Sequence, residues 1–131
     1  EYLEDLCADF EDIAFVASHT GMPVALDELL AQGKPWEPIP QLRALVLKPT
    51  LLGALANSEA LVARARELKL KVIVSSCFES GLGLGQLARL AGEWAPDQAP
   101  GLDTRRWLAR DLLDKQGQPD PGRMDPLFHR D

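Results

Sequence analysis

Short runs of apolar residues alternate along the chain with longer segments whose apolar residues recur every three or four positions. The short runs predict strands, and the longer segments predict amphipathic helices. We therefore expect strands at 1–6, 23–26, 44–47, 71–74 and 101–103, and helices over 9–20, 54–69, 84–94 and 104–113. The polar segment 114–131, rich in proline and glycine, is expected to form a weakly ordered tail.

This order of elements predicts an α/β fold, in which parallel strands are joined by crossover helices. A complete (β/α) barrel takes about 250 residues. The chain has 131 residues, so residues 1–113 are expected to form half of a TIM-type barrel. Such a half leaves two open sheet edges that have to be covered.

The helix over 54–69 should turn one apolar stripe toward the sheet. That stripe comprises Leu55, Leu61, Val62, Ala65 and Leu68. Trp94 and Trp107 are expected to pack from the two later helices.

The stretch RALVLKPTLLG, residues 43–53, places a lysine at the end of a buried strand. Lys48 precedes Pro49, which favours extended geometry at the lysine and has no N–H for a neighbouring strand. A lone charge at a strand-to-helix turn is where α/β enzymes place catalytic groups. Alternatively, Lys48 only marks the edge of the strand and favours solubility.

Polar or small residues also follow the other predicted strands, at Glu4, Asp27, Ser75 and Gly101. In a parallel sheet these positions share the carboxyl-terminal edge with Lys48. Carboxylates such as Glu4 and Asp27 are oxygen ligands suited to Mg²⁺, and a nearby metal would disfavour the ammonium form of Lys48. The alternative is that the two acids merely solvate the rim of the sheet.

Gly81, Gly83 and Gly85 follow a strand, but the dinucleotide-binding fingerprint would require a glycine where Gln86 stands. We expect these glycines to form a tight turn over 78–85 and to let the next helix pack closely. No serine lies in a G-x-S-x-G elbow, and two histidines and two distant cysteines do not have the spacing of a zinc site.

The formal net charge of −6 argues against binding to nucleic acid or to an anionic membrane. No apolar run is long enough for a transmembrane helix, and the acidic opening EYLED does not resemble a signal peptide. Cys7 and Cys77 form no disulfide framework, which indicates a reducing compartment and a cytoplasmic location. Because the first residue is not Met, we expect the chain to be part of a longer polypeptide.

Five segments in order carry a family resemblance: YLEDLC (2–7), ALDELL (25–30), LVLKPTLLG (45–53), VIVSSCFESGLGLGQLARL (72–90) and APGLDT (99–104). From Tyr2 to about Thr104 the chain resembles the second half of an o-succinylbenzoate synthase of the enolase superfamily. Leu6 departs from the proline usual in the first of these motifs.

The resemblance implies the C-terminal half of the barrel domain, with a Mg²⁺ site of three carboxylates on three successive strands. Glu4 matches the second carboxylate, Asp27 the third, and Lys48 one of two lysines that face each other across the substrate. Ser75 and the backbone at Gly101 match positions that hold the succinyl carboxylate of the substrate. The family's first aspartate and first lysine pair have no counterpart here, so a missing N-terminal half of the enzyme is an expected partner.

The activity that the resemblance implies is a syn dehydration in the menaquinone pathway. A base removes a proton next to a carboxylate, Mg²⁺ stabilises the enediolate, and hydroxide leaves as water. In the family, the lysine matching Lys48 stabilises the anion by its charge. Two alternatives stay open: an N-acylamino acid racemase or dipeptide epimerase of the same superfamily, and an inactive half-barrel fragment that self-associates.

Overall fold

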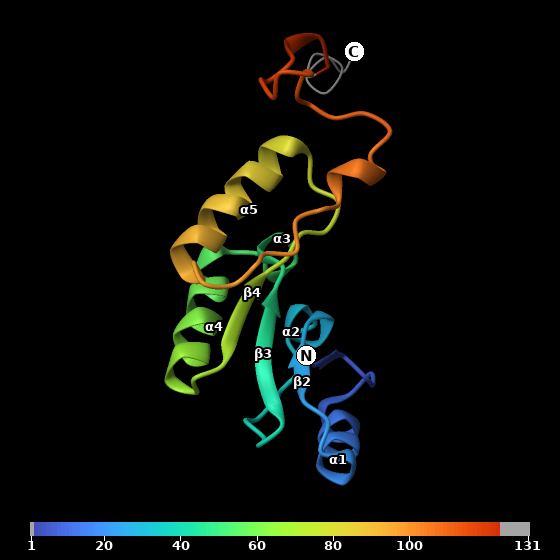
Figure 1. Cartoon of the computed structure of the whole chain (residues 1–131), viewed down its shortest axis with the longest axis vertical. Helices are drawn as coiled ribbons and strands as arrows, with labels where there is room; N and C mark the ends of the chain where they lie inside the picture. Colours follow the sequence, from blue (N-terminus) through green and yellow to red (C-terminus); the bar gives the residue numbers. More distant parts are fainter. Residues whose placement is uncertain (1, 124–131) are drawn as a thin grey trace.

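The computed structural model describes residues 2–123 and contains one four-stranded parallel sheet, ordered β1-β2-β3-β4 (Figure 1). Its strands are β1 (Leu3–Glu4), β2 (Val24–Leu26), β3 (Leu42–Leu47) and β4 (Lys71–Val74). Its helices are α1 (Phe10–Thr20), α2 (Glu28–Ala31), α3 (Pro49–Leu52), α4 (Leu55–Glu67), α5 (Gly81–Trp94) and the 3₁₀ turn η1 (Arg105–Trp107). The expected parallel α/β architecture is confirmed.

The longest strand, β3, lies in the middle of the sheet and pairs with β2 and β4. Its sequence LRALVL is buried at five of six positions, as is usual for a strand covered on both faces. Each strand-to-strand connection includes a helix, so sequential strands become parallel neighbours. This connectivity brings the carboxyl ends of all four strands to one edge of the sheet.

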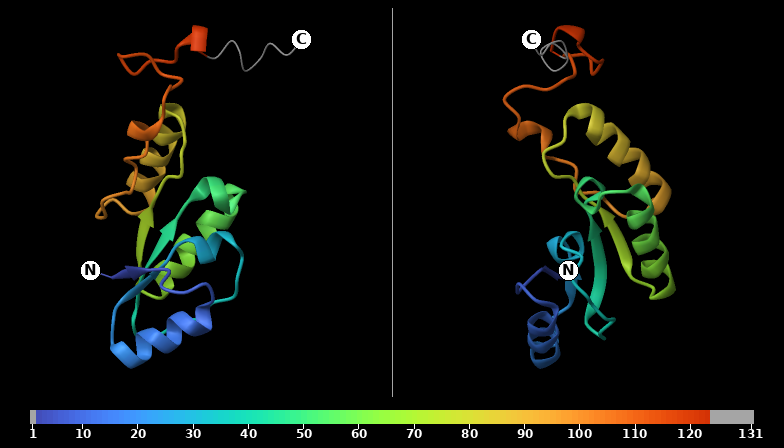
Figure 2. Two further views of the ribbon diagram at one scale, coloured as in Figure 1. Left: turned by 90° about the vertical axis from the view of Figure 1, so that its right-hand side faces the viewer. Right: turned by 180° about the vertical axis from the view of Figure 1, so that it is seen from behind.

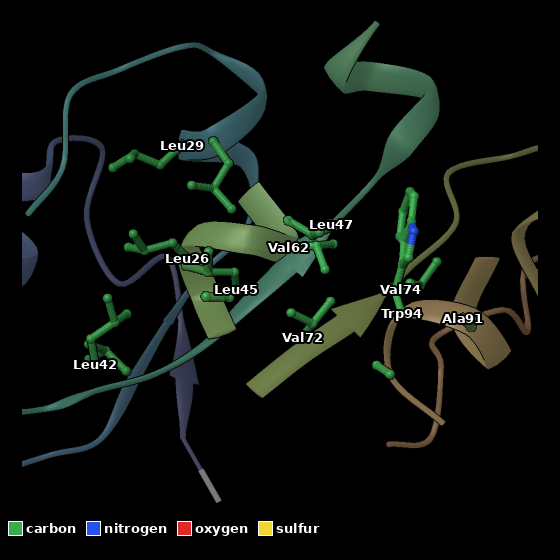
Figure 3. Close-up of a cluster of buried hydrophobic side chains, with 14 of the residues drawn as sticks. Leu26, Leu29, Leu42, Leu45, Leu47, Val62, Val72, Val74, Ala91 and Trp94 are labelled. Carbon is green, nitrogen blue, oxygen red and sulfur yellow. The ribbon is translucent and has the colours of Figure 1, made fainter. Parts of the chain in front are cut away.

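Helices α1, α4 and α5 lie along the outside of the sheet, as the two further views also show (Figure 2). The main core forms between these helices and the strands (Figure 3). Its fully buried members include Ile13, Val24, Leu26, Leu45 and Leu47. A second, smaller cluster of Ala25, Ala44 and Val46, with Tyr2 and Ile73, lies apart from it. Alternate residues of a strand point to opposite faces, so the small residues form the other, inner face of the sheet.

Helix α5 begins at Gly81, so the expected glycine-rich turn over 78–85 is wrong. Gly81 starts the helix because its N–H donates to the Asp111 carboxylate, 2.8 Å away, which binds one of the donors left free at a helix start. A Cβ at Gly81 would lie 2.8 Å from Asp111 Oδ2 and would collide with the Leu113 side chain. Glycine thus permits the close approach of segment 111–113 to Gly81, whereas a Cβ at Gly85 would meet nothing within 4 Å.

The helix expected over 104–113 is also wrong, because only the three residues of η1 are helical. Long-range contacts hold this segment in another shape. Asp111 accepts hydrogen bonds from the N–H groups of Gly81 and Leu112 and pairs with Arg105 at 2.5 Å. These bonds hold the chain beyond Leu108 in an irregular path and override its helical propensity.

Two packing expectations need correction. Leu55 is 47% exposed because α4 begins there, whereas Val62 and Ala65 are buried as expected. Trp94 is buried, but Trp107 is 69% exposed, since no helix forms to carry it against the sheet.

Part of the expected tail, residues 114–123, is described, and the remainder, 124–131, lies outside the described residues. Asp114 Oδ1 accepts hydrogen bonds from the backbone of Gln116 and Gln118, and Arg123 donates to the carbonyl of Leu113. Within the described part of the chain, no helix is both long and apolar enough to cross a bilayer.

Candidate active site

The residues predicted at the strand ends are brought to one edge of the sheet. Glu4 ends β1, Asp27 follows β2, Lys48 follows β3 and Ser75 follows β4. Gly101 forms a parallel bridge with Ser75, as the next strand along the sheet would. The predicted parallel neighbourhood of these positions is therefore confirmed, while their roles remain predictions.

Lys48 is the centre of this edge. Its Nζ donates to Asp27 Oδ2 at 2.7 Å and to the Glu28 carboxylate. The Lys48 and Asp27 side chains are only 14% and 8% exposed, whereas Glu28 is 56% exposed. One ammonium group thus lies against two carboxylates from the neighbouring β2–α2 turn, largely shielded from water on the Asp27 side.

Burial and hydrogen bonding shift the pKa values of Lys48, Asp27 and Glu28 in different directions. Burial alone would lower the pKa of Lys48, but its hydrogen bonds with Asp27 and Glu28 outweigh burial and raise the pKa above the usual lysine value. Burial raises the pKa of Asp27, against the opposing effect of Lys48. The hydrogen bond from Lys48 lowers the pKa of Glu28. The two carboxylates therefore favour the ammonium form of Lys48, which would supply positive charge at this edge.

Asp27 also has an oxygen that no group in the described residues satisfies. Its Oδ1 is buried without a hydrogen-bond partner there. Glu4, exposed at the end of the adjacent strand, adds a negative charge that helps to raise the pKa of Asp27. An orphaned carboxylate oxygen beside a second acid fits a cation that prefers oxygen ligands. In residues 2–123, however, no three His, Cys, Asp or Glu side chains gather into a group that could hold a metal.

Asp5 was not assigned a role from the sequence. Its two carboxylate oxygens accept hydrogen bonds from the backbone N–H groups of Asp27, at 3.1 Å, and Leu29, at 2.9 Å. Glu28 was also missed as a partner of Lys48, although its position directly after Asp27 at a strand end was a usable signal. For Asp5, no local signal existed, because its partners lie 22 and 24 residues away.

Ser75 and Gly101 lie together as expected of a shared site. Ser75 Oγ donates to the Gly101 carbonyl at 3.3 Å, and Ser76 Oγ donates to the same oxygen at 3.0 Å. A Cβ at residue 101 would lie 2.9 Å from Ser75 Oγ, so glycine leaves room for that hydroxyl. The Gly101 N–H donates to the Val74 carbonyl. Gly101 thus contributes space beside Ser75 rather than a free N–H donor.

Another pair near this edge was missed. Thr50 Oγ1 donates to the Glu79 carboxylate at 2.5 Å and links α3 to the segment before α5. Cys77, in that segment, and Cys7 are free thiols, both partly buried. Burial raises the pKa of the Cys77 thiol, with Glu79 adding to the effect. This cysteine is therefore less inclined than usual to ionise and attack as a thiolate.

Comparison with known proteins identifies relatives of the chain. No family model matches it. It is 36% identical to an o-succinylbenzoate synthase of Pasteurella multocida, over 100% of this chain and 39% of that protein. It is 39% identical to one of Salmonella paratyphi B, over 99% of this chain and 40% of that protein. The chain therefore spans about two fifths of the length of these curated relatives.

Solved structures of low sequence identity share the fold. MenC from Desulfotalea psychrophila matches with a TM-score of 0.70 at 23% identity, over 87% of this chain and 34% of that one. The L-Ala-D/L-Glu epimerase from Bacillus subtilis matches with a TM-score of 0.69 at 19% identity, over 87% and 33%. The likeness to these structures is one of fold, and the expected half of a TIM-type barrel is confirmed. Along its whole length the chain is thus a homologue of the o-succinylbenzoate synthases of the enolase superfamily.

Proposed function

We propose that the chain is part of a Mg²⁺-dependent carbon–oxygen lyase that forms o-succinylbenzoate in menaquinone biosynthesis. The observation that carries this proposal is the position of Lys48, whose Nζ pairs with the carboxylates of Asp27 and Glu28 at the carboxyl edge of a parallel sheet. Homology to o-succinylbenzoate synthases supports the choice of reaction.

In this proposal Lys48 supplies positive charge to the reaction. Removal of a proton from the carbon beside a substrate carboxylate spreads negative charge onto that carboxylate. A preorganised cation aimed at the developing charge stabilises the transition state more than the ground state. The carbon–oxygen bond then breaks, hydroxide takes up a proton and leaves as water, and a carbon–carbon double bond remains. The proton-transferring group would come from outside these 131 residues.

Glu4 and Asp27 would hold the metal in this proposal. The free, buried Oδ1 of Asp27 and the exposed carboxylate of Glu4 on the next strand are the available oxygen ligands. When bound, Mg²⁺ would supply further positive charge beside the substrate carboxylate. Mg²⁺ commonly binds one or two protein carboxylates and keeps several waters, so these two fit part of its coordination.

Ser75 and Gly101 would form the end of the site that receives the second carboxylate of the substrate. The Ser75 hydroxyl is directed to the Gly101 carbonyl in this structure and can rotate to donate to a ligand instead. Because residue 101 has no side chain, a substrate could approach Ser75 closely. We also propose that the protein works in the cytoplasm with the remaining part of the barrel as its partner, and binds neither nucleic acid nor membranes.

A racemase or epimerase is the second candidate, because the fold also matches an L-Ala-D/L-Glu epimerase. Both reactions begin with removal of a proton next to a carboxylate, and a lysine–carboxylate site serves either. Only the dehydratase expels hydroxide. The third candidate, an inactive half-barrel that self-associates, predicts no turnover under any condition.

One experiment separates the three candidates. The natural polypeptide that carries these residues would be purified and supplied with Mg²⁺ and either the hydroxylated dehydratase substrate, N-acylamino acids or dipeptides. We expect o-succinylbenzoate to form, as seen by its aromatic absorbance, and expect chelation of the metal to abolish it. Racemisation without dehydration would favour the second candidate. Absence of both, with a larger mass in solution, would favour the third.

A further inference from the structure

Asp5 lies in the turn that follows β1 and reaches across to the end of β2. Its backbone N–H continues the sheet by donating to the Ala25 carbonyl at 3.2 Å. Its φ of +34° is rare for a residue with a side chain and turns the carboxylate toward the next strand. Both carboxylate oxygens are used there, one by the N–H of Asp27 and one by the N–H of Leu29.

The segment that Asp5 binds, from Asp27 to Leu29, is not stable in this conformation by itself. Helix α2 has only four residues, fewer than an isolated helix needs to be stable. Its N-cap residue is Asp27, whose side chain makes no capping hydrogen bond because it is directed to Lys48. The first N–H groups of a helix have no partner within the helix. Asp5 accepts from the N–H of Leu29 in that turn, which leaves Asp27 free to face the site.

We propose that Asp5 is a positioning residue, which holds the backbone from Asp27 to Leu29 so that the Asp27 and Glu28 carboxylates meet Lys48 Nζ. Its part in the reaction rests on the proposed function, whereas its part in placing the two carboxylates rests on the hydrogen bonds alone. Asp5 makes neither a hydrogen bond nor an ion pair with Lys48, so its proposed effect on Lys48 passes through the turn. The rival explanation is that Asp5 only caps α2.

Coupling between Asp5 and Lys48 distinguishes positioning from capping. Asp5→Asn keeps the shape of the side chain but turns an amide toward one of the two N–H donors. The test compares the thermal unfolding midpoints of the natural polypeptide with Asp5→Asn, Lys48→Met and both changes. If Asp5 places the carboxylates, Lys48→Met should lower the midpoint less when Asp5 is already changed. Equal drops in both backgrounds would overturn the proposal and leave Asp5 a cap.

Metal affinity and steady-state kinetics provide a second test of the positioning role of Asp5. Loss of a group that orients a ligand typically costs about 10–100-fold in metal affinity or activity. We expect Asp5→Asn to weaken the binding of Mn²⁺, measured by electron paramagnetic resonance. We also expect it to lower kcat by about 10–100-fold, with a smaller change in KM. Asp12→Asn is the matched control, since Asp12 is an exposed carboxylate on α1 and should leave all readings unchanged.

The two proposals fail in different ways. A wild-type polypeptide that forms no o-succinylbenzoate overturns the proposed function, yet the unfolding midpoints still decide whether Asp5 acts on Lys48. A wild-type enzyme that dehydrates normally, with additive midpoints and an unchanged kcat in Asp5→Asn, overturns the positioning role alone.

Discussion

The β2–β3 edge, formed by Asp27, Glu28 and Lys48, and the C-terminal segment 102–123 both contain ion pairs, but they rest on different supports. At the edge, each charged residue follows a buried strand, and Asp27 is itself buried. In the C-terminal segment, Arg105 and Asp111 pair on an irregular chain in which only Leu113 is buried. The segment extends past the start of α5, near Gly81, and away from the sheet (Figure 1).

This difference indicates which of the two regions can hold catalytic residues. A charge must be held within a fraction of an ångström to stabilise a transition state, and a strand buried on both faces provides that precision. The ion pairs of the C-terminal segment are exposed on at least one side and contribute little stability. Predictions about the two regions should therefore differ in kind: lost turnover at the edge, and small changes in stability in the segment.

The largest effect is expected for Lys48→Ala. It removes the positive charge aimed at the developing anion, and loss of one such preorganised group typically costs about 10²–10³ in rate. Lys48→Arg should not restore activity, because the planar guanidinium is larger than an ammonium group and cannot take its place. Steady-state kinetics on the natural polypeptide measures both variants.

Lys71→Ala is the control for this experiment, because Lys71 is an exposed lysine at the opposite end of β4. It should keep near-normal turnover. Circular dichroism must show that Lys48→Ala keeps its fold. Near-full activity in Lys48→Ala would reduce Lys48 to a charge at the edge of a strand, and activity lost only through unfolding would make it structural.

The next effect is on stability. Leu45 is fully buried in the central strand β3, so Leu45→Ala should lower the free energy of unfolding by about 2–5 kcal/mol. Chemical denaturation followed by circular dichroism measures this change. A loss of unfolding free energy well below 1 kcal/mol would mean that the sheet does not hold the charged residues at its edge more firmly than the C-terminal segment holds its own.

The sequence was most informative where neighbouring residues determine the structure. The apolar run before Lys48 and Pro49 predicted a buried strand with a charge at its end, and the run VIV predicted β4. Repeated strand–helix order then predicted the shared edge of Asp27 and Lys48, because parallel connectivity leaves few arrangements.

The sequence was least informative where a side chain acts across a long separation. Asp111 reaches back 30 residues to Gly81, and that bond starts α5 at a glycine and keeps the later segment from becoming a helix. Asp5 reaches forward in the same way to Asp27. Local patterns cannot report such bonds, since each depends on a fold already formed.

A smaller effect is expected for Asp111→Ala. It removes the acceptor at the start of α5, and loss of a capping residue typically costs about 1 kcal/mol. The hydrogen bond from Gly81 holds the pKa of Asp111 below its usual range, with Arg105 acting in the same direction. A depressed pKa stabilises the fold above the unfolded-state pKa, about 3.9, and this stabilisation is lost as pH falls through the folded-state pKa.

The gap in unfolding free energy between wild type and Asp111→Ala should therefore be largest near neutral pH and shrink in acid. Denaturation at several pH values measures this gap. Asp97→Ala, at an exposed aspartate after α5, is the control. A gap that stays constant into acid would mean that the charge of Asp111 does not hold the C-terminal segment.

The smallest effect is expected for Trp107→Ala, although tryptophan is the largest side chain. Trp107 is 69% exposed, and its one recorded aromatic contact is with Arg106, whose guanidinium lies 5.1 Å from the ring centroid. Such an exposed contact contributes about 0.5–1 kcal/mol, and the variant should lose no more than that. Trp94→Ala is the matched comparison, since Trp94 is buried in the main core and its truncation should cost about 3–5 kcal/mol. Equal losses at the two tryptophans would mean that the C-terminal segment packs onto the protein as firmly as α5 does, and the contrast between the two regions would fail.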